Sequence, residues 1–327
     1  MGNRKLTYTE FSVAAALIGL VALLILHMFA NTYANHMRYS CQQNLKAFGT
    51  VFRMYMEESE GEFLPPPAPY ADIGEGGWSN LIWSAPKGIT IYPDYLNDLE
   101  IARCPSDGLQ YPYAKDLSPR LPRDGGTYDT WQTKALSEGD TVSYDYFLSA
   151  ELAQSYLYTG YLMFDSPAYY GYCGASTAID DGVDVDIMGV GALGAKKLND
   201  DLPIDGSRWP PWVPSPPEAV GFDNRQSILR LRSGMQRFFI TDGSRWYWNQ
   251  GKKPMVPSSS SAPVMWDAFG RNDPAESDPG PVLFNHKPNG GNILFLDGHV
   301  EYMRYGETFP IIDNPTTVDL YTRYGVR

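Results

Sequence analysis

The sequence lacks the short patterns by which most enzymes and metal proteins are recognised. It has three cysteines in 327 residues, Cys41, Cys104 and Cys173, and none of them belongs to a C-x-x-C pair, so no zinc or thioredoxin-type motif is present. No nucleophile elbow, Gly-rich phosphate loop or Ser-His-Asp order stands out either. We therefore expect a protein that is not an enzyme and that needs no cofactor.

Charge is also scarce, and positive charge is the scarcer kind. Only 20% of the residues are charged, with 26 Lys and Arg against 38 Asp and Glu, which gives a formal net charge of −12. Such a surface repels a phosphate backbone, so nucleic acid is not an expected partner. The 31 glycines, 26 prolines and 23 tyrosines indicate an exported, loop-rich β protein.

One stretch has no Lys, Arg, Asp or Glu at all. Residues 11–30, FSVAAALIGLVALLILHMFA, are long enough to cross a bilayer as a helix. Arg4 and Lys5 precede this stretch and the next basic residue is Arg38, so the positive-inside rule places the N-terminus in the cytoplasm and the rest of the chain outside. A cleaved secretory signal is the rival interpretation. However, the apolar run is longer than a usual signal core, and no small-x-small cleavage site follows it.

Apolar residues continue at helical spacing after the span. They are Met37, Cys41, Leu45, Phe48, Phe52 and Tyr55. We predict one helix over residues 6–59, transmembrane at 11–30 and amphipathic afterwards, which Gly61 and the following prolines end. The expected fold class is α+β: this helix packs on an extracytoplasmic head, residues 60–327, built on an antiparallel β-sheet with a large loop-rich insert at 109–225.

Glu10 stands at the mouth of the apolar run, where an unpaired charge is costly. Residues 7–10, Thr-Tyr-Thr-Glu, fit a capping box, which would explain Glu10 as a helix cap. Residues 6–30 also resemble the N-terminal segment of type IV pilins and type II secretion pseudopilins. That resemblance makes Leu6 the first mature residue and Glu10 the assembly residue, which pairs with the N-terminal amine of a neighbouring subunit. The processing peptidase of the family needs Gly before the cut and Lys5 stands there, so the basic segment 1–5 is either removed or kept as part of an anchor.

Further motifs extend the resemblance. Residues 40–66 resemble a passage of bacterial prepilin-like proteins that carry a C-terminal H-x9-DG element, and RCPSD at 103–107 resembles their C-P-S-D element. The H-x9-DG element corresponds to His286, Asp297 and Gly298, with one additional intervening residue. We expect a disulfide between Cys41 and Cys104, because Cys41 lies on the helix stripe that faces the head; three buried thiols are the alternative.

The C-terminal part reads as strands. Residues 235–243 and 264–267 are predicted strands, and residues 282–303 are predicted to form a three-stranded meander with a hairpin turn at Asp297 and Gly298. His286 would then lie at the opposite end of a strand from Asp297 and His299, too far away to share an ion with them.

The insert is the least predictable part. Tyrosines crowd residues 144–172 in a partly alternating pattern, which favours the core of a β-rich insert. The Pro-rich segment 203–217, which contains Trp209 and Trp212, is expected to be extended and solvated. Asp180, Asp184 and Asp186 are candidate Ca²⁺ ligands in an acidic loop, with a solvated loop as the default.

Together these features predict a structural subunit of a pilus or pseudopilus-like filament. Its N-terminal helices would associate with those of identical copies, and an assembly machinery would draw it from the bacterial cytoplasmic membrane into a filament at the cell surface or in the periplasm. One alternative is a membrane-anchored monomer whose Tyr- and Trp-rich head binds a polysaccharide or a protein. Another is an anchored hydrolase that uses residues of the insert.

Overall fold

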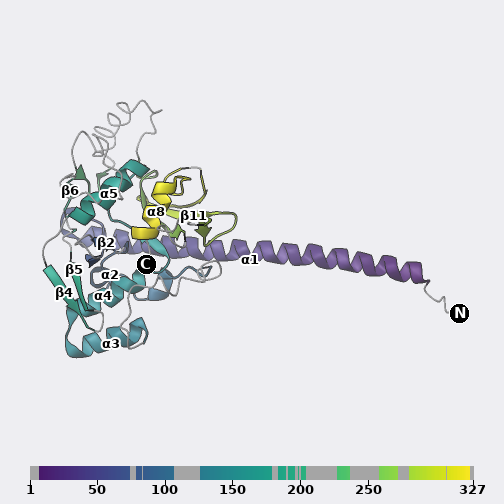
Figure 1. The fold of residues 1–327 in the computed structure, drawn as a ribbon, viewed down its shortest axis with the longest axis horizontal. Helices are drawn as coiled ribbons and strands as arrows, with labels where there is room; N and C mark the ends of the chain where they lie inside the picture. The colour runs from purple at the N-terminus through teal and green to yellow at the C-terminus, as the bar shows by residue number, and fades with distance from the viewer. Residues whose placement is uncertain are drawn as a thin grey trace, which may run out of the picture.

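A single long helix projects from a mixed α and β head (Figure 1). The computed structural model describes residues 7–73, 79–82, 84–106, 126–178, 183–188, 191–195, 198, 200–203, 227–235, 258–271, 280–306 and 308–324. Helix α1 (Tyr8–Glu58) has 51 residues, which makes it about 77 Å long at about 1.5 Å per residue. It is continuous through residue 30 and matches the predicted range 6–59 to within two residues at the first end and one at the second.

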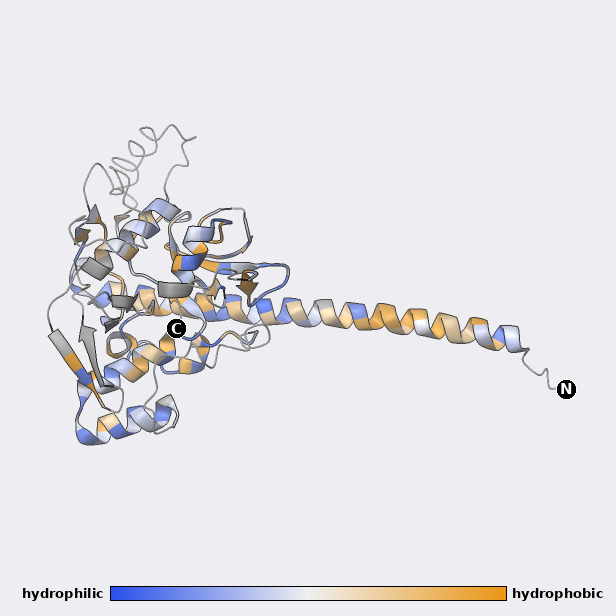
Figure 2. Cartoon of the chain, viewed as in Figure 1, coloured by the Kyte–Doolittle hydropathy of each residue, from blue (hydrophilic) through white to orange (hydrophobic). Residues whose placement is uncertain are grey.

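The two halves of α1 have different surroundings. The apolar first half extends away from the head, and its orange colour in Figure 2 marks the hydrophobic residues 11–30. In the second half, Cys41, Leu45, Phe48 and Phe52 are buried against the head, together with Val51. The predicted change from a free apolar helix to an amphipathic, packed helix is therefore confirmed.

The centre of the head is a four-stranded sheet with α1 on one face. Its strand order is β12-β11-β8-β3, and all its neighbours are antiparallel. The strands are β3 (Tyr156–Tyr158), β8 (Pro263–Asp267), β11 (Gly290–Phe295) and β12 (Val300–Arg304). Tyr156, Tyr158 and Leu294 belong to the core that α1 shares. Leu157 and Ile293 belong to the core on the opposite face.

That opposite face is covered by α5 (Ser166–Ala178) and α8 (Pro315–Tyr324). A second four-stranded sheet has the order β2-β1-β5-β4. Its strands are β1 (Tyr70–Ile73), β2 (Ser79–Ile82), β4 (Val183–Ile187) and β5 (Gly191–Ala195). The other described elements are η1 (Glu60–Glu62), α2 (Gly88–Ile91), η2 (Leu99–Ala102), α3 (Tyr128–Glu138), α4 (Thr141–Leu152), β6 (Leu202–Pro203), β7 (Ser227–Ile228), β9 (Phe269–Gly270) and β10 (Leu283–Phe284).

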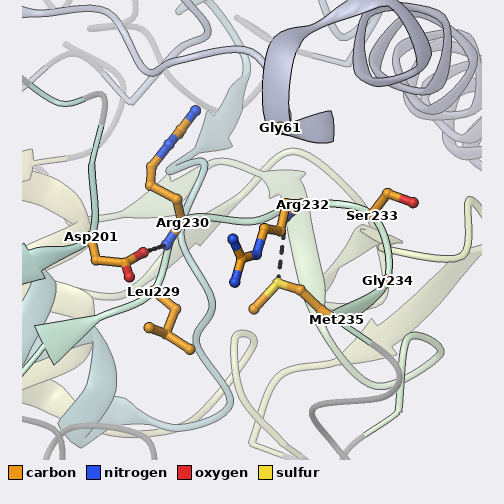
Figure 3. Close-up of a pocket in the computed structure, with 8 residues that line it drawn as sticks. All are labelled: Gly61, Asp201, Leu229, Arg230, Arg232, Ser233, Gly234 and Met235. Carbon is orange, nitrogen blue, oxygen red and sulfur yellow. Dashed lines mark hydrogen bonds between the residues drawn. The ribbon is translucent and has the colours of Figure 1, made fainter.

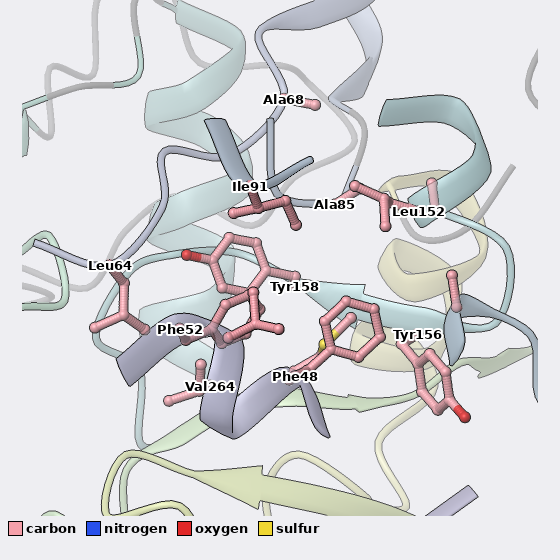
Figure 4. Packing of buried hydrophobic residues seen from close by; sticks show 14 of the residues in the cluster. Phe48, Phe52, Leu64, Ala68, Ala85, Ile91, Leu152, Tyr156, Tyr158 and Val264 are labelled. Carbon is pink, nitrogen blue, oxygen red and sulfur yellow. The ribbon is translucent and has the colours of Figure 1, made fainter. Parts of the chain in front are cut away.

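Aromatic side chains join α1 to the sheet (Figure 4). Phe48 and Phe52 point from α1 toward Tyr156 and Tyr158 of β3, with ring centroids 6.1 Å apart for Phe48 and Tyr156 and 4.9 Å apart for Phe52 and Tyr158. Burying one such side chain contributes about 1.5 to 3 kcal/mol. The second half of α1 is therefore part of the core of the head.

The tyrosine-rich region differs from the predicted β-rich insert. Tyr144 and Tyr146 lie on α4, and Tyr169 and Tyr172 lie on α5. Nine of the twelve residues of α4 are buried, so neither helical nor strand periodicity appears in its sequence. In addition, β3 pairs with β8. The described part of 109–225 is therefore mainly helical and contributes a strand to the main sheet.

The predicted meander is only half correct. The hairpin is confirmed, because β11 pairs with β12 and the Phe295 N–H donates to the His299 carbonyl at 3.0 Å. The preceding strand, β10, pairs with β9 instead, and only an isolated bridge between His286 and Gly290 links this segment to β11. The strand predicted at 264–267 is confirmed as β8. Residues 204–217 and 236–243 lie outside the described residues.

Candidate functional site

The first half of α1 is an apolar surface that no other described part of the chain covers. Phe11, Leu23 and Phe29 are 68%, 68% and 69% exposed. Among the described residues, α1 is the one helix long and apolar enough to cross a bilayer. A surface of this size and kind needs lipid or other apolar helices around it, because the exposure of so many apolar side chains to water costs free energy.

Glu10 caps this helix. The Thr7 backbone N–H donates to Glu10 Oε2 at 2.8 Å, and the Glu10 N–H donates to Thr7 Oγ1 at 3.4 Å. The predicted capping box is therefore confirmed. The pairing of Glu10 with a neighbouring subunit stays a prediction, and Leu6 lies outside the described residues.

A cluster of two thiols and an imidazole lies where α1 enters the head. Cys41 comes from α1, Cys104 follows η2, and His286 follows β10; their ligand atoms all lie within 4.8 Å of one another. Cys104 Sγ lies 3.5 Å from His286 Nε2. All three residues are buried, at 0%, 3% and 2% exposure. We call these three residues the thiol–imidazole cluster.

Asp267, at the end of β8, lies against this cluster. Its Oδ2 is 3.1 Å from His286 Nε2 and accepts hydrogen bonds from the backbone N–H and the side-chain amide of Asn292, at 2.7 and 2.8 Å. Asp267 Oδ1 is buried and has no hydrogen-bond partner among the described residues. On the other side of the imidazole ring, His286 Nδ1 lies 3.5 Å from Ser106 Oγ.

These neighbours shift the protonation of the cluster. Burial by itself lowers the pKa of His286, but the carboxylate of Asp267 more than offsets it and raises that pKa to about 10. The hydrogen bond with Cys41, together with burial, raises the pKa of the Cys104 thiol. Without a metal ion the cluster therefore holds a neutral Cys104 thiol beside a protonated His286 that contacts Asp267.

The expected partners Cys41 and Cys104 do lie together. The structure records them as two thiols with no bond between them, so the disulfide itself stays a prediction. No pattern in the sequence indicates that His286 joins them, because residues 41, 104 and 286 are far apart along the chain. The proximity of His286 to Cys41 becomes visible only when the strands around His286 are placed against α1.

The other residues of the C-terminal motif hold the β11–β12 turn against α1. Gly298 has a φ of +89°, which favours glycine. Arg53 Nη2 of α1 donates to the Asp297 carbonyl at 2.9 Å. Asp297 Oδ1 lies 2.6 Å from His299 Nδ1. This pair follows the last residue of β11, whereas His286 forms a bridge with its first residue, Gly290, so His286 lies at the opposite end of the strand. Turn formation and docking thus account for Asp297 and Gly298.

The candidate calcium ligands have a different setting from the one expected. Asp184 and Asp186 lie on strand β4, not in a loop. Asp186 is exposed. Asp180 lies outside the described residues, so the calcium site stays a prediction.

A cavity of about 270 Å³ lies beside the end of α1 (Figure 3). Its lining includes Gly61, Asp201, Arg230 and Arg232. The Arg230 guanidinium is already engaged, because it donates to the carbonyls of Gly160 and Leu64 at 3.1 and 2.8 Å. The Asp201 carboxylate accepts from the Arg230 backbone N–H at 2.7 Å, as the dashed line in Figure 3 shows. These contacts join the segment after β7 to Leu64, which follows η1, and to Gly160, which follows β3, and this is a structural role.

Comparison with known proteins adds no relative. No protein-family model, no curated protein and no solved structure matches this chain. The fold and the surface of α1 themselves define a class. Within the part of the chain that the structure describes, one exposed apolar helix has membrane-spanning length, and its continuation forms part of the core of an α+β head.

Proposed function

We propose that the chain is a structural subunit of a pilus or pseudopilus-like filament that assembles through the first half of α1. The observation that carries this proposal is the division of one unbroken helix into a free apolar half and a packed half. A simple membrane anchor needs no rigid connection to its head. A filament does, because the position of each helix in the shared bundle then fixes the position of its head.

The two halves are joined rigidly because the same helix crosses the boundary. Arg38, just after the apolar run, lies over the ring of Tyr302 on β12 at 4.5 Å. Ten residues on, Phe48 and then Phe52 are in the core. The packing begins within about three turns of residue 30, which leaves a short, continuously helical connection between the apolar half and the head.

Assembly would exchange lipid for identical helices. In the bilayer the apolar residues of α1 contact acyl chains, and in a filament core they contact the same residues of neighbouring copies. Glu10 is the one carboxylate beside the apolar run, and the resemblance to pilins assigns it a positive partner on a neighbouring copy. A paired charge is tolerated in such a core, whereas an unpaired charge is not.

The alternative, a monomeric anchored protein with a Tyr- and Trp-rich binding head, has less support from the described residues. Tyr146, Tyr156, Tyr158, Tyr161 and Tyr169 are all buried. Among the described head residues, the large hydrophobic side chains that are well exposed are Ile89, Leu136 and Val142 rather than aromatic ones. The tyrosines therefore serve the core, as the sequence favoured.

Electron microscopy of sheared surface material tests the proposal. Cells that express the chain with a short epitope tag after residue 324 should yield thin filaments that an antibody against the tag decorates along their length. The membrane fraction of the same cells supplies the control for expression and export. If the tagged chain is found only as membrane-bound monomers in exporting cells, the proposal fails and the anchored binding protein becomes the better account.

A further inference from the structure

We propose that the thiol–imidazole cluster is a binding site for a thiophilic d¹⁰ metal ion, with Zn²⁺ as its type, held by Cys41 Sγ, Cys104 Sγ and His286 Nε2. Two thiolates and one imidazole are a ligand set that zinc sites use. Soft thiolate ligands also exclude Ca²⁺ and Mg²⁺, which require oxygen ligands. The site differs from the Ca²⁺ candidates of the sequence in both place and chemistry.

The distances fit a tetrahedral ion. With bonds of about 2.3 Å to sulfur and about 2.05 Å to nitrogen, the edge between a sulfur and a nitrogen ligand is about 3.6 Å and the edge between two sulfurs about 3.8 Å. Cys104 Sγ and His286 Nε2 are 3.5 Å apart, and all three ligand atoms fall within 4.8 Å of one another. Shifts of a fraction of an ångström are enough to bring them onto one ion.

Asp267 borders the proposed site. Its Oδ2 lies 3.1 Å from the proposed ligand atom, His286 Nε2. Asp267 is not in the set whose ligand atoms all lie within 4.8 Å of one another, so it lies beside the three ligands, next to His286. Its second oxygen, Oδ1, is buried without a hydrogen-bond partner among the described residues, and a cation next to it would satisfy that oxygen.

The surroundings also fit a metal ligand. A coordinating histidine donates the N–H of its other ring nitrogen to a nearby acceptor, and Ser106 Oγ lies 3.5 Å from His286 Nδ1. Asn292 holds Asp267 in place with two hydrogen bonds. Binding the ion displaces three protons into solvent, one from each thiol and the Nε2 proton of the His286 imidazolium, because a thiol or an imidazole nitrogen must be deprotonated to coordinate a metal.

A metal ion here would join three segments of the chain. It would link α1 through Cys41, the segment after η2 through Cys104, and the connection between β10 and β11 through His286. These are the segments that meet where α1 enters the head. The ion would therefore fix α1 to the head at the connection on which the proposed function depends. The evidence for the metal site is its own geometry and does not require the proposed function.

The experiment uses the full chain, purified in detergent micelles, reduced, and stripped of metal. Adding Co²⁺, a spectroscopic substitute for Zn²⁺, should produce the thiolate-to-cobalt charge-transfer band and the intense ligand-field bands of a tetrahedral site, saturating at about one ion per chain. Added Zn²⁺ should bleach these bands. Elemental analysis of protein purified without chelators should find about one zinc per chain.

Substitutions distinguish a metal site from its two alternatives, a Cys41–Cys104 disulfide and ordinary core packing. Cys41→Ala, Cys104→Ala and His286→Ala should each abolish or strongly weaken the cobalt spectrum. Cys173→Ala, which removes the buried thiol of α5, is the matched control and should leave the spectrum intact. His286→Ala keeps both sulfurs, so it removes a metal site but leaves a disulfide free to form.

The wild-type titration decides the outcome even if a variant fails to fold. A folded, reduced wild-type chain that gives no cobalt bands overturns the proposal. So does protein whose Cys41 and Cys104 are isolated as a disulfide that His286→Ala leaves unchanged, because the pair is then a covalent cross-link. If all thiols titrate as free and no metal is bound, the cluster is ordinary core packing and the proposal is also wrong. Filament assembly is read separately by microscopy, so either proposal can fail alone.

Discussion

Arg53 of α1 donates a 2.9 Å hydrogen bond to the backbone carbonyl of Asp297, which lies 244 residues later in the turn between β11 and β12. A side chain at the next residue, Gly298, would meet the same guanidinium and push it away from the turn. The turn that the sequence marks as a hairpin is thus also a docking point for the helix. This contact connects the N-terminal and C-terminal motifs of the chain.

Gly298→Ala should destabilise the head for two reasons. Its positive φ costs an alanine about 1 to 2 kcal/mol, and the new Cβ would displace Arg53 and weaken a hydrogen bond that contributes about 1 kcal/mol. Gly139→Ala is the matched control: Gly139 also has a positive φ, +72°, but nothing lies within 4 Å of its added Cβ. Urea unfolding of both variants measures the difference. Equal losses would show that the Arg53 contact contributes nothing.

Phe48→Ala should separate the second half of α1 from the head. Phe48 is fully buried against Phe52 and Tyr156, and removing a buried Phe side chain costs about 3 to 5 kcal/mol. Met54→Ala, on the same half of the helix but 40% exposed, should change stability by no more than about 0.5 kcal/mol. Hydrogen exchange of residues 41–55 reads the result directly. Unchanged protection in Phe48→Ala would contradict the packing described here.

The pH dependence of stability should carry a contribution from Asp145. Burial raises the pKa of this carboxyl, although the Ile89 N–H, the Tyr70 hydroxyl, Lys87 and Ser149 all act to lower it. The folded state therefore binds the Asp145 proton more tightly than the unfolded state does. The sign follows: the unfolding free energy falls as pH rises from the ordinary carboxyl pKa to the raised one.

Asp145→Asn should remove that slope. Its stability relative to the wild type should rise with pH across the window, because the variant keeps an acceptor for the Ile89 N–H and has no charge to bury. Glu57→Gln, at an exposed site on α1, is the control and should keep the wild-type slope. Glu151, whose pKa burial also raises, stays in both variants and cancels in the comparison. Parallel stability curves for Asp145→Asn and wild type would refute the assignment.

Glu10 has two candidate roles that one substitution separates. Glu10→Gln keeps an oxygen that can accept from the Thr7 N–H, since Gln also serves in a capping box, but it removes the charge. Thr7→Ala does the reverse, because it weakens the cap by about 1 kcal/mol and keeps the carboxylate. If Glu10 pairs with a neighbouring copy, Glu10→Gln should lose filaments while Thr7→Ala retains them, with export and head folding normal in both. Filaments from Glu10→Gln in wild-type numbers would leave Glu10 as a cap alone.

Local patterns predicted the parts of this fold that depend on neighbours in sequence. The uncharged run before Ala30, the spacing of Leu45, Phe48 and Phe52, and the Asp297–Gly298 turn each act within a few residues. The helical state of the tyrosine-rich region was not predicted. Most residues of α4 are buried, so its sequence shows no alternation between an apolar and a polar face from which a helical period could be read. Pairing partners escaped too, since β10 joins β9 through contacts that no short window contains.

The thiol–imidazole cluster shows the same limit for a site. The sequence assigned Cys41 to the inner face of a helix. His286 lies near it because β11 pairs with β8, which carries Asp267, and because His286 forms a bridge with Gly290 at the start of β11. No spacing rule joins residues 41, 104 and 286. A ligand set made of single residues from three distant segments becomes visible only in three dimensions.

Cross-linking between copies tests most directly whether the free half of α1 is an assembly surface. Leu17 on α1 and Leu136 on α3 are both exposed leucines, at 58% and 65%, so Leu17→Cys and Leu136→Cys form a matched pair. With both expressed in cells and treated with the same oxidant, Leu17→Cys should yield disulfide-linked dimers in sheared filaments, and Leu136→Cys should stay monomeric. Dimers from Leu136→Cys alone, or from neither variant, would contradict the account.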